Sequence, residues 1–213
     1  MYQGVLYGKD IDVKMIENHP VTLNIYETSD DNNVLTVTAA SVLVTSVERR
    51  HQLVEILEMV SFENSSTRTY VPGPEPMKLL RFSLPEGFKE LQVRTDLLEG
   101  DVLQVDVGFA LTSPIPPGVH DLLFSYRFPY EGMETSFTKS FPHGADQFRV
   151  LTEEDGILMG SPDLARSEPI IVGSNVYELL IGENLSIGSQ IVITLTDLPE
   201  ATIWDWIMAH AED

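Results

Sequence analysis

The chain has 213 residues, 43% of them hydrophobic, and its 13 basic and 33 acidic residues give a formal net charge of −20 at pH 7. This length suits one large β-sandwich or two small domains, and the hydrophobic content excludes wholesale disorder. The acidity argues against nucleic acid and anionic membrane surfaces as partners, and the lack of cysteine excludes a disulfide scaffold, a zinc–thiolate site and a thiol nucleophile.

Short apolar stretches, cut at close intervals by turn residues, recur along almost the whole chain. They are rich in Val, Thr and aromatic residues, which favour strands. We predict strands at 2–7, 21–26, 34–47, 51–62 and 70–71, around Phe82, Val93, Val105, Phe124, Phe137 and Phe148, and at 157–159, 170–172, 176–181 and 190–195. No apolar run is long enough to span a bilayer, so we expect no transmembrane segment.

The segment 51–62 is ambiguous between helix and strand. A helix would place Leu53, Ile56, Leu57 and Val60 on one face. A strand would align Val54, Ile56, Val60 and Phe62, with Glu58 interrupting that apolar face. The turn-forming residues that follow, and the strand patterns on both sides, favour the strand.

Turn clusters divide the chain into four parts. Residues 1–33 hold the N-terminal strands and a linker, 34–152 the main β-sandwich, 153–199 additional strands and 200–213 a helical tail. The strands of 153–199 either pack on the sandwich or form a small second domain. We predict an all-β fold, an antiparallel Greek-key sandwich of the immunoglobulin or fibronectin kind with a short C-terminal helix.

Two sets of residues suggest interaction surfaces. The start of the chain lacks the features of a signal peptide and reads as a strand, so we expect a piece of a longer protein or an edge strand that pairs with a neighbour. The helical tail carries both tryptophans, which suit docking to a partner or to the sandwich itself. The candidate interaction residues are Tyr2, Val5, Tyr7, Ile203, Trp204, Trp206, Ile207 and Met208.

One strand carries aromatic side chains at alternate positions. In the segment 124–130, Phe124, Tyr126, Phe128 and Tyr130 share a face, while Ser125 and Arg127 point the other way. Such a face belongs to the core or, with Phe137, to a carbohydrate-binding surface, and the core interpretation is the ordinary one.

The motifs Tyr2-Gln-Gly-Val-x-Tyr7, Val21-Thr-Leu-Asn-Ile-Tyr-Glu-Thr28, Phe82-Ser-Leu-Pro85, Pro116-Pro-Gly118 and Ser161-Pro-Asp-Leu164 carry a family likeness through their order. The chain resembles the C-terminal part of poorly characterised bacterial extracytoplasmic proteins, in which a carboxypeptidase regulatory-like domain precedes a larger β-sandwich. The resemblance implies secretion or display at the cell surface, without established catalysis. Most of the regulatory-like domain, the signal peptide and the membrane anchor of that pattern are missing from this sequence.

Catalytic motifs are absent from the sequence. The five histidines do not lie at metal-ligand spacing, and no phosphate loop, nucleophile elbow or dinucleotide fingerprint occurs. We therefore expect neither an enzyme nor a bound cofactor, although a site assembled from distant residues would escape notice. Calcium is a weak alternative, with oxygen ligands from Asp30, Asp31, Glu153, Glu154 and Asp155 in two polar turns.

The sequence thus favours a non-enzymatic structural or interaction module of a cell-surface or extracellular assembly, which contacts a protein partner or further copies of itself through strand edges and terminal segments. A carbohydrate- or calcium-binding sandwich is the second hypothesis, and an enzyme the third. Glycan attachment is open at the sequons that begin at Asn64 and Asn184.

Overall fold

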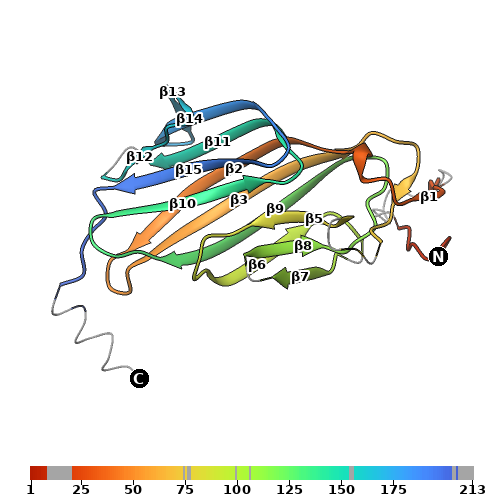
Figure 1. Ribbon diagram of the computed structural model, residues 1–213, viewed down its shortest axis with the longest axis horizontal. Helices are drawn as coiled ribbons and strands as arrows, with labels where there is room; N and C mark the ends of the chain where they lie inside the picture. Colours follow the sequence, from red (N-terminus) through yellow and green to blue (C-terminus); the bar gives the residue numbers. More distant parts are fainter. Residues whose placement is uncertain are drawn as a thin grey trace.

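The computed structural model describes residues 1–8, 21–73, 75, 78–98, 100–105, 107–153, 156–202 and 205. Its architecture is a β-sandwich, which confirms the predicted all-β fold (Figure 1). The larger layer is a curved seven-stranded sheet with the strand order β13 (Ala165–Val172), β14 (Asn175–Leu185), β11 (Ala145–Glu153), β2 (Leu35–Glu48), β3 (Leu53–Asn64), β9 (Gly118–Pro129) and β6 (Lys89–Thr95).

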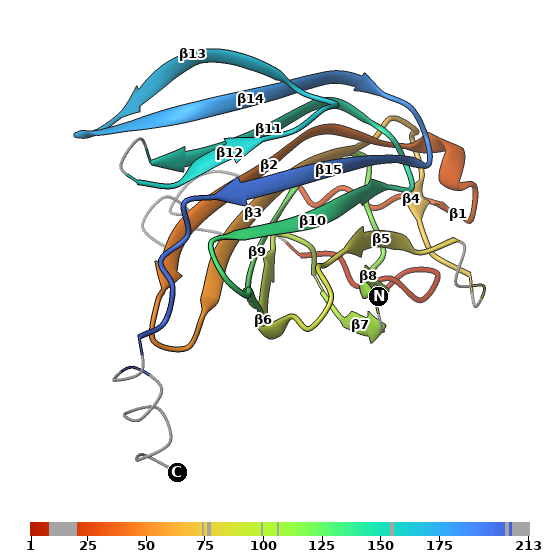
Figure 2. The same cartoon turned by 60° about the vertical axis from the view of Figure 1, so that its left-hand side comes forward.

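Two smaller sheets together form the second layer. One has the order β10 (Glu134–Phe141), β15 (Ser189–Thr196) and β12 (Leu158–Gly160), and the other β5 (Leu80–Ser83), β8 (Gly108–Leu111) and β7 (Val102–Val105). They meet where β10 approaches β5, and both lie over the concave side of the large sheet (Figure 2). A short parallel pair, β1 (Thr28–Ser29) and β4 (Thr69–Tyr70), lies near the N-terminus, and a 3-10 turn at Asn32–Val34 leads into β2.

The strand prediction for 51–62 is confirmed, since β3 runs from Leu53 to Asn64 and alternates between buried and more exposed residues. It pairs antiparallel with β2 and β9 over its whole length. The large sheet also contains one parallel pair, β2 and β11. This arises because the consecutive strands β10 and β11 belong to opposite layers, so the chain crosses the sandwich between Phe141 and Ala145 and arrives beside β2.

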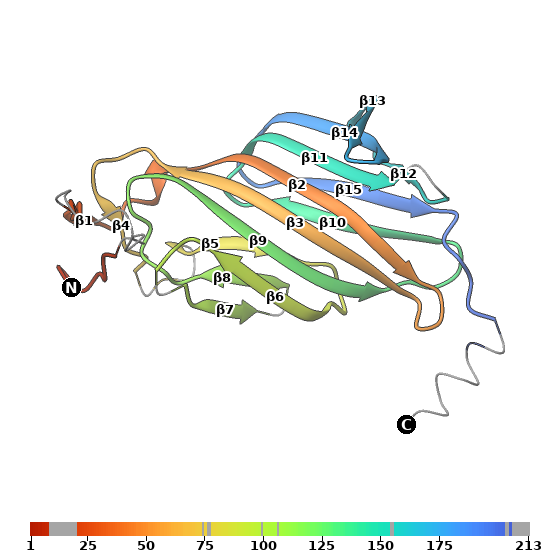
Figure 3. The ribbon, with the colours of Figure 1, turned by 180° about the vertical axis from the view of Figure 1, so that it is seen from behind.

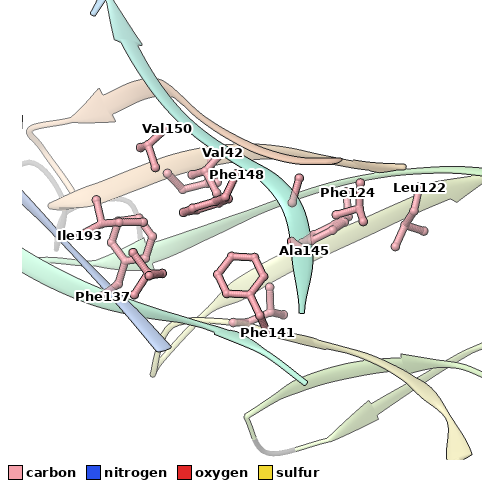
Figure 4. Close-up of a cluster of buried hydrophobic side chains, with 14 of the residues drawn as sticks. Val42, Leu122, Phe124, Phe137, Phe141, Ala145, Phe148, Val150 and Ile193 are labelled. Atoms are coloured by element: carbon pink, nitrogen blue, oxygen red, sulfur yellow. The ribbon is translucent and has the colours of Figure 1, made fainter. Parts of the chain in front are cut away.

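The segment 153–199 is built into both layers. It contributes β12 to β15; β14 pairs with β11 in the large sheet and β15 pairs with β10 in the second layer. The core lies between the layers, and Figure 4 shows Phe137, Phe141 and Ile193 of the second layer facing Val42 and Phe148 of the large sheet. The rings of Phe141 and Phe148 meet edge to face at 4.8 Å.

The prediction of strands at 2–7 and 21–26 is wrong. Residues 2–5 form a tight turn closed by Tyr2 and Val5, whose backbones exchange hydrogen bonds of 3.0 and 2.9 Å. Gln3 and Gly4 both have positive φ angles, 47° and 81°, which is the backbone of a two-residue hairpin turn and cannot continue a strand. Residues 21–27 form no ladder either, and pairing begins only at Thr28.

The predicted helix at 200–213 lies outside the described residues, except for 200–202 and Asp205. Asp205 is helical, and Thr202 and Asp205 form a reciprocal cap. The Asp205 carboxylate accepts the Thr202 backbone N–H at 2.8 Å, and the Thr202 hydroxyl accepts the Asp205 N–H at 3.3 Å. This Thr-x-x-Asp box is a helix-start signal that can be read from the sequence. The arginine of the β2–β3 turn, Arg49, forms an ion pair with Asp205 at 3.1 Å.

Candidate functional site

A buried ion pair lies where the three sheets meet. Glu58 of β3 and Lys139 of β10 are 2.7 Å apart, and their side chains are only 3% and 6% exposed. Both residues stand at inward positions of otherwise apolar strand faces, Glu58 between Ile56 and Val60 and Lys139 between Phe137 and Phe141. Glu58 interrupts the apolar pattern of its strand because it is a charged residue buried in the core.

Two further residues complete the bonding of this pair. The Tyr126 hydroxyl on β9 donates to the same Glu58 oxygen at 2.6 Å, and the Lys139 ammonium also donates to the Ser83 carbonyl on β5 at 2.6 Å. The ring of Phe124 lies 5.8 Å from the ammonium. Glu58, Tyr126, Lys139 and Ser83, here called the seam cluster, thus tie the large sheet to both sheets of the second layer.

Burial raises the pKa of the Tyr126 hydroxyl well above its ordinary value, and the adjacent Glu58 carboxylate raises that pKa further. Tyr126 therefore stays protonated, and donates to Glu58, throughout the physiological pH range. A charge that is desolvated but fully paired can persist inside a protein, whereas the same charge without its partner is costly. The seam cluster accordingly has the chemistry of a structural clamp between sheets.

A small pocket adjoins the seam cluster. It is lined by Glu58 and Lys139, by Arg81 and Phe82 of β5, by His143 in the turn after β10, and by apolar side chains of the core. Burial lowers the pKa of the His143 imidazole, and the charge of Arg81 lowers it further.

The predicted calcium ligands that the structure describes, Asp30, Asp31 and Glu153, do not converge. Asp30 forms an ion pair with Lys78 at 2.5 Å, and the Lys78 ammonium lowers the pKa of the Asp30 carboxyl. Asp31 accepts hydrogen bonds from the backbone and side chain of Asn33. Asp30 and Asp31 lie just before the start of β2. Glu153 lies beside β2 about ten residues, roughly 30 Å, farther along that strand. Glu154 and Asp155 lie outside the described residues, and the described part of the chain contains no group of three potential metal ligands.

The aromatic face of β9 belongs to the core, as the ordinary interpretation predicted. Phe124, Tyr126, Phe128 and Tyr130 are all at most 3% exposed, and Phe137 packs against Phe128 at 5.2 Å. None of these rings is available to stack on a sugar.

Asn64 of the first sequon is buried in the folded protein. Asn64 is 1% exposed, and its side-chain amide donates to the backbone carbonyls of Arg68 and Ile115 at 2.8 and 2.9 Å. Its side-chain oxygen accepts from the backbone and hydroxyl of Ser66. Asn184, by contrast, is exposed on β14.

The candidate interaction residues near the N-terminus have different environments. Tyr2 is exposed, whereas Val5 is only 2% exposed. The Tyr7 hydroxyl donates to the Tyr26 carbonyl and also contacts the Thr69 hydroxyl, both at 2.9 Å. Val5 and Tyr7 line a pocket of about 330 Å³ together with His120 at the start of β9. The other candidates, Ile203, Trp204, Trp206, Ile207 and Met208, lie outside the described residues.

Exposed aliphatic side chains gather on two outermost strands, a feature that the sequence analysis missed. On β13, the outer strand of the large sheet, Ile170, Ile171 and Val172 are 36%, 75% and 58% exposed. β7 is an outer strand of the sheet formed by β5, β8 and β7. Its residues Val102, Leu103 and Val105 are exposed, and so is Val107 just after it. These two strands lie on opposite sides of the molecule (Figures 1 and 3).

Comparison with known proteins gives only distant likenesses. No protein-family model and no curated protein matches the chain. Among solved structures, an M1 zinc metallopeptidase from Deinococcus radiodurans, a glutamate-to-alanine mutant bound to a Tyr-Ser-Ala substrate, matches at 11% identity and a TM-score of 0.45. The unmutated peptidase matches at 10% identity and a TM-score of 0.42. Each match covers 75% of this chain but only 42% of the peptidase chain. Likenesses this weak support no assignment of activity.

No helix in the described part of the chain is both long enough and apolar enough to cross a bilayer.

Proposed function

We propose that this protein is a non-enzymatic interaction module of an extracytoplasmic assembly, which associates with further copies of itself through outer strands of its sandwich. The observation that carries the proposal is the exposed aliphatic run Ile170–Val172 on β13. The extracytoplasmic location rests on the resemblance to bacterial surface proteins with a regulatory-like domain.

The end of the β13–β14 hairpin differs from the rest of the surface in its charge. Residues 170–177, Ile-Ile-Val-Gly-Ser-Asn-Val-Tyr, contain no ionisable group except the tyrosine, in a chain with a net charge of −20. The stretch itself brings no carboxylate to a contact between two acidic molecules, and the neighbouring Glu153 carboxylate accepts hydrogen bonds from Asn175 and Tyr177. Burial of one large aliphatic side chain there stabilises a contact by about 1.5–3 kcal/mol.

The hairpin is better suited to contacts between side chains than to the addition of a long strand. A bulge between Ser167 and Ile170 breaks the regular pairing of β13, and Pro169 within it has no backbone N–H. Bulges and prolines on an outer strand limit open-ended strand addition. We therefore place the contact at the side chains of Ile170, Ile171 and Val172.

The experiment compares self-association of the wild-type chain and the variant Ile171→Lys by sedimentation equilibrium. The introduced charge must be desolvated in the contact, so we expect the dissociation constant to rise at least about tenfold. Ile187→Lys is the matched control, because Ile187 is 80% exposed in the turn between β14 and β15. Equal weakening by both variants, or a wild-type chain that stays monomeric at high concentration, would refute the proposal.

A further inference from the structure

Two buried nitrogen atoms next to the seam cluster have no hydrogen-bond partner. They are Nε of Arg81 and Nε2 of His143, and both side chains line the same pocket. Buried polar atoms are normally paired, and leaving one unpaired destabilises the folded protein. Because both side chains line the same pocket, a polar group bound there would be a partner for both atoms.

Arg81 is unusual in this chain because of its charge. The protein has 33 acidic residues, yet the half-buried guanidinium of Arg81 forms no ion pair with any residue that the structure describes. The other charges in the pocket, those of Glu58 and Lys139, neutralise each other at 2.7 Å. Arg81 therefore gives the pocket a net positive charge within an acidic protein.

The rest of the lining is apolar. Phe82, Phe141, Phe148 and Val60 contribute hydrocarbon surface to the pocket. The pocket is small, with about 30 Å³ open to the centre of a water molecule. A ligand that fits therefore has few atoms, one anionic end and one apolar end.

We propose that this pocket binds a small aliphatic carboxylate, of the size of acetate or propionate. One carboxylate oxygen accepts the hydrogen bond of Arg81 Nε, and the other accepts from His143 Nε2 when the imidazole is protonated. The short alkyl group lies against Phe141 and Phe148. A carboxylate suits this arrangement better than a chloride ion, because it has two acceptors for two separate donors and an apolar group for the apolar wall.

Proton uptake accompanies this binding. Without a ligand, burial and the Arg81 charge keep the pKa of His143 below its ordinary value of 6.5, so the imidazole is neutral near pH 7. A bound carboxylate favours the imidazolium and raises this pKa, so binding tightens as the pH falls. Of the other charged groups that face His143 across the pocket, Arg81 opposes its protonation, while Glu58 and Lys139 remain paired with each other.

The test is a titration with sodium propionate at constant ionic strength, followed by the backbone amide resonances of Phe82, Phe141 and His143. We expect a saturable shift of these resonances in the wild-type protein. The shift should be absent with propionamide, which has the same shape without the charge. Affinity should be higher at about pH 6 than at about pH 8, and His143→Gln should remove that difference.

Arg81→Gln should weaken propionate binding at least about tenfold. Arg94→Gln is the matched control, because Arg94 lies exposed on β6, outside the pocket. Equal responses to propionate and propionamide in the wild-type protein, or no saturable response, would overturn the proposal. The pocket would then be a cavity that holds only water. The propionamide comparison is decisive even if Arg81→Gln does not fold. Neither outcome depends on whether the hairpin of β13 mediates association.

Discussion

The seam cluster shows how single residues hold the two layers together. Lys139 donates to Glu58 from the second layer and to the Ser83 carbonyl on β5. The Ser140 backbone N–H next to it donates to the Ser83 hydroxyl at 2.8 Å, so β10 and β5 are joined at two adjacent residues. These bonds are directional, whereas the aromatic packing around them is not. The pair therefore fixes how β10 and β5 align with each other and with β3.

Replacing Lys139 with methionine tests this role. The variant keeps most of the side-chain volume but leaves Glu58 as a buried carboxylate with the Tyr126 hydroxyl as its remaining donor in the seam cluster. We expect a loss of roughly 3–5 kcal/mol in the free energy of unfolding, measured by urea denaturation.

The double variant Glu58→Leu with Lys139→Met is the control, since it removes both charges. It should recover much of the stability lost in Lys139→Met, because an apolar pair needs no desolvation. If the double variant is less stable than Lys139→Met alone, an unpaired Glu58 is not the source of the lost stability, and the expectation fails.

Among the elements, the contact between β5 and β8 depends on one glycine. Gly108 lies opposite Ser83, with φ of 149°, and a Cβ atom there would lie 2.0 Å from the Phe82 carbonyl oxygen. Any side chain would push β5 away from β8. The seam cluster would be displaced as well, since Ser83 belongs to it. Gly108 is the first residue of β8.

We expect Gly108→Ala to lower the free energy of unfolding by about 2–3 kcal/mol or more, measured by thermal or urea unfolding. Gly160→Ala is the control on β12, where a new Cβ atom would meet open space and the φ angle is ordinary. It should change stability by no more than about 0.5 kcal/mol. Similar losses in the two variants would show that the close approach at Phe82 is relieved without cost.

For the whole molecule, the net charge of −20 is the dominant electrostatic feature. Acidic groups repel one another in the compact state, and salt screens this repulsion over distances of about 10 Å at 0.1 M. We expect the melting temperature to rise between about 20 mM and about 500 mM sodium chloride. Calcium chloride at matched ionic strength should raise it no further, because Asp30 and Asp31 are engaged with Lys78 and Asn33. A clear excess of stabilisation by calcium would instead indicate a specific site.

The residue pattern was enough to predict the all-β class and most of the strands, because alternation with a period of two is a local property of a strand with one buried face. It also placed the aromatic face of β9 in the core. The strand prediction for 2–7 was wrong. These residues have a composition typical of strands but contain a Gln-Gly turn, which the residue pattern alone does not distinguish from a strand.

The order of neighbouring strands and the pairing of buried charges became visible only in the folded structure. Glu58 and Lys139 are 81 residues apart in the chain, and each alone looks like an error in an apolar pattern. Arg81 and His143 likewise share a pocket only because β5 and β10 meet over the large sheet. Such contacts depend on how the layers are stacked. Local propensity does not encode that stacking, because it follows from burying the inner faces of all the sheets at once.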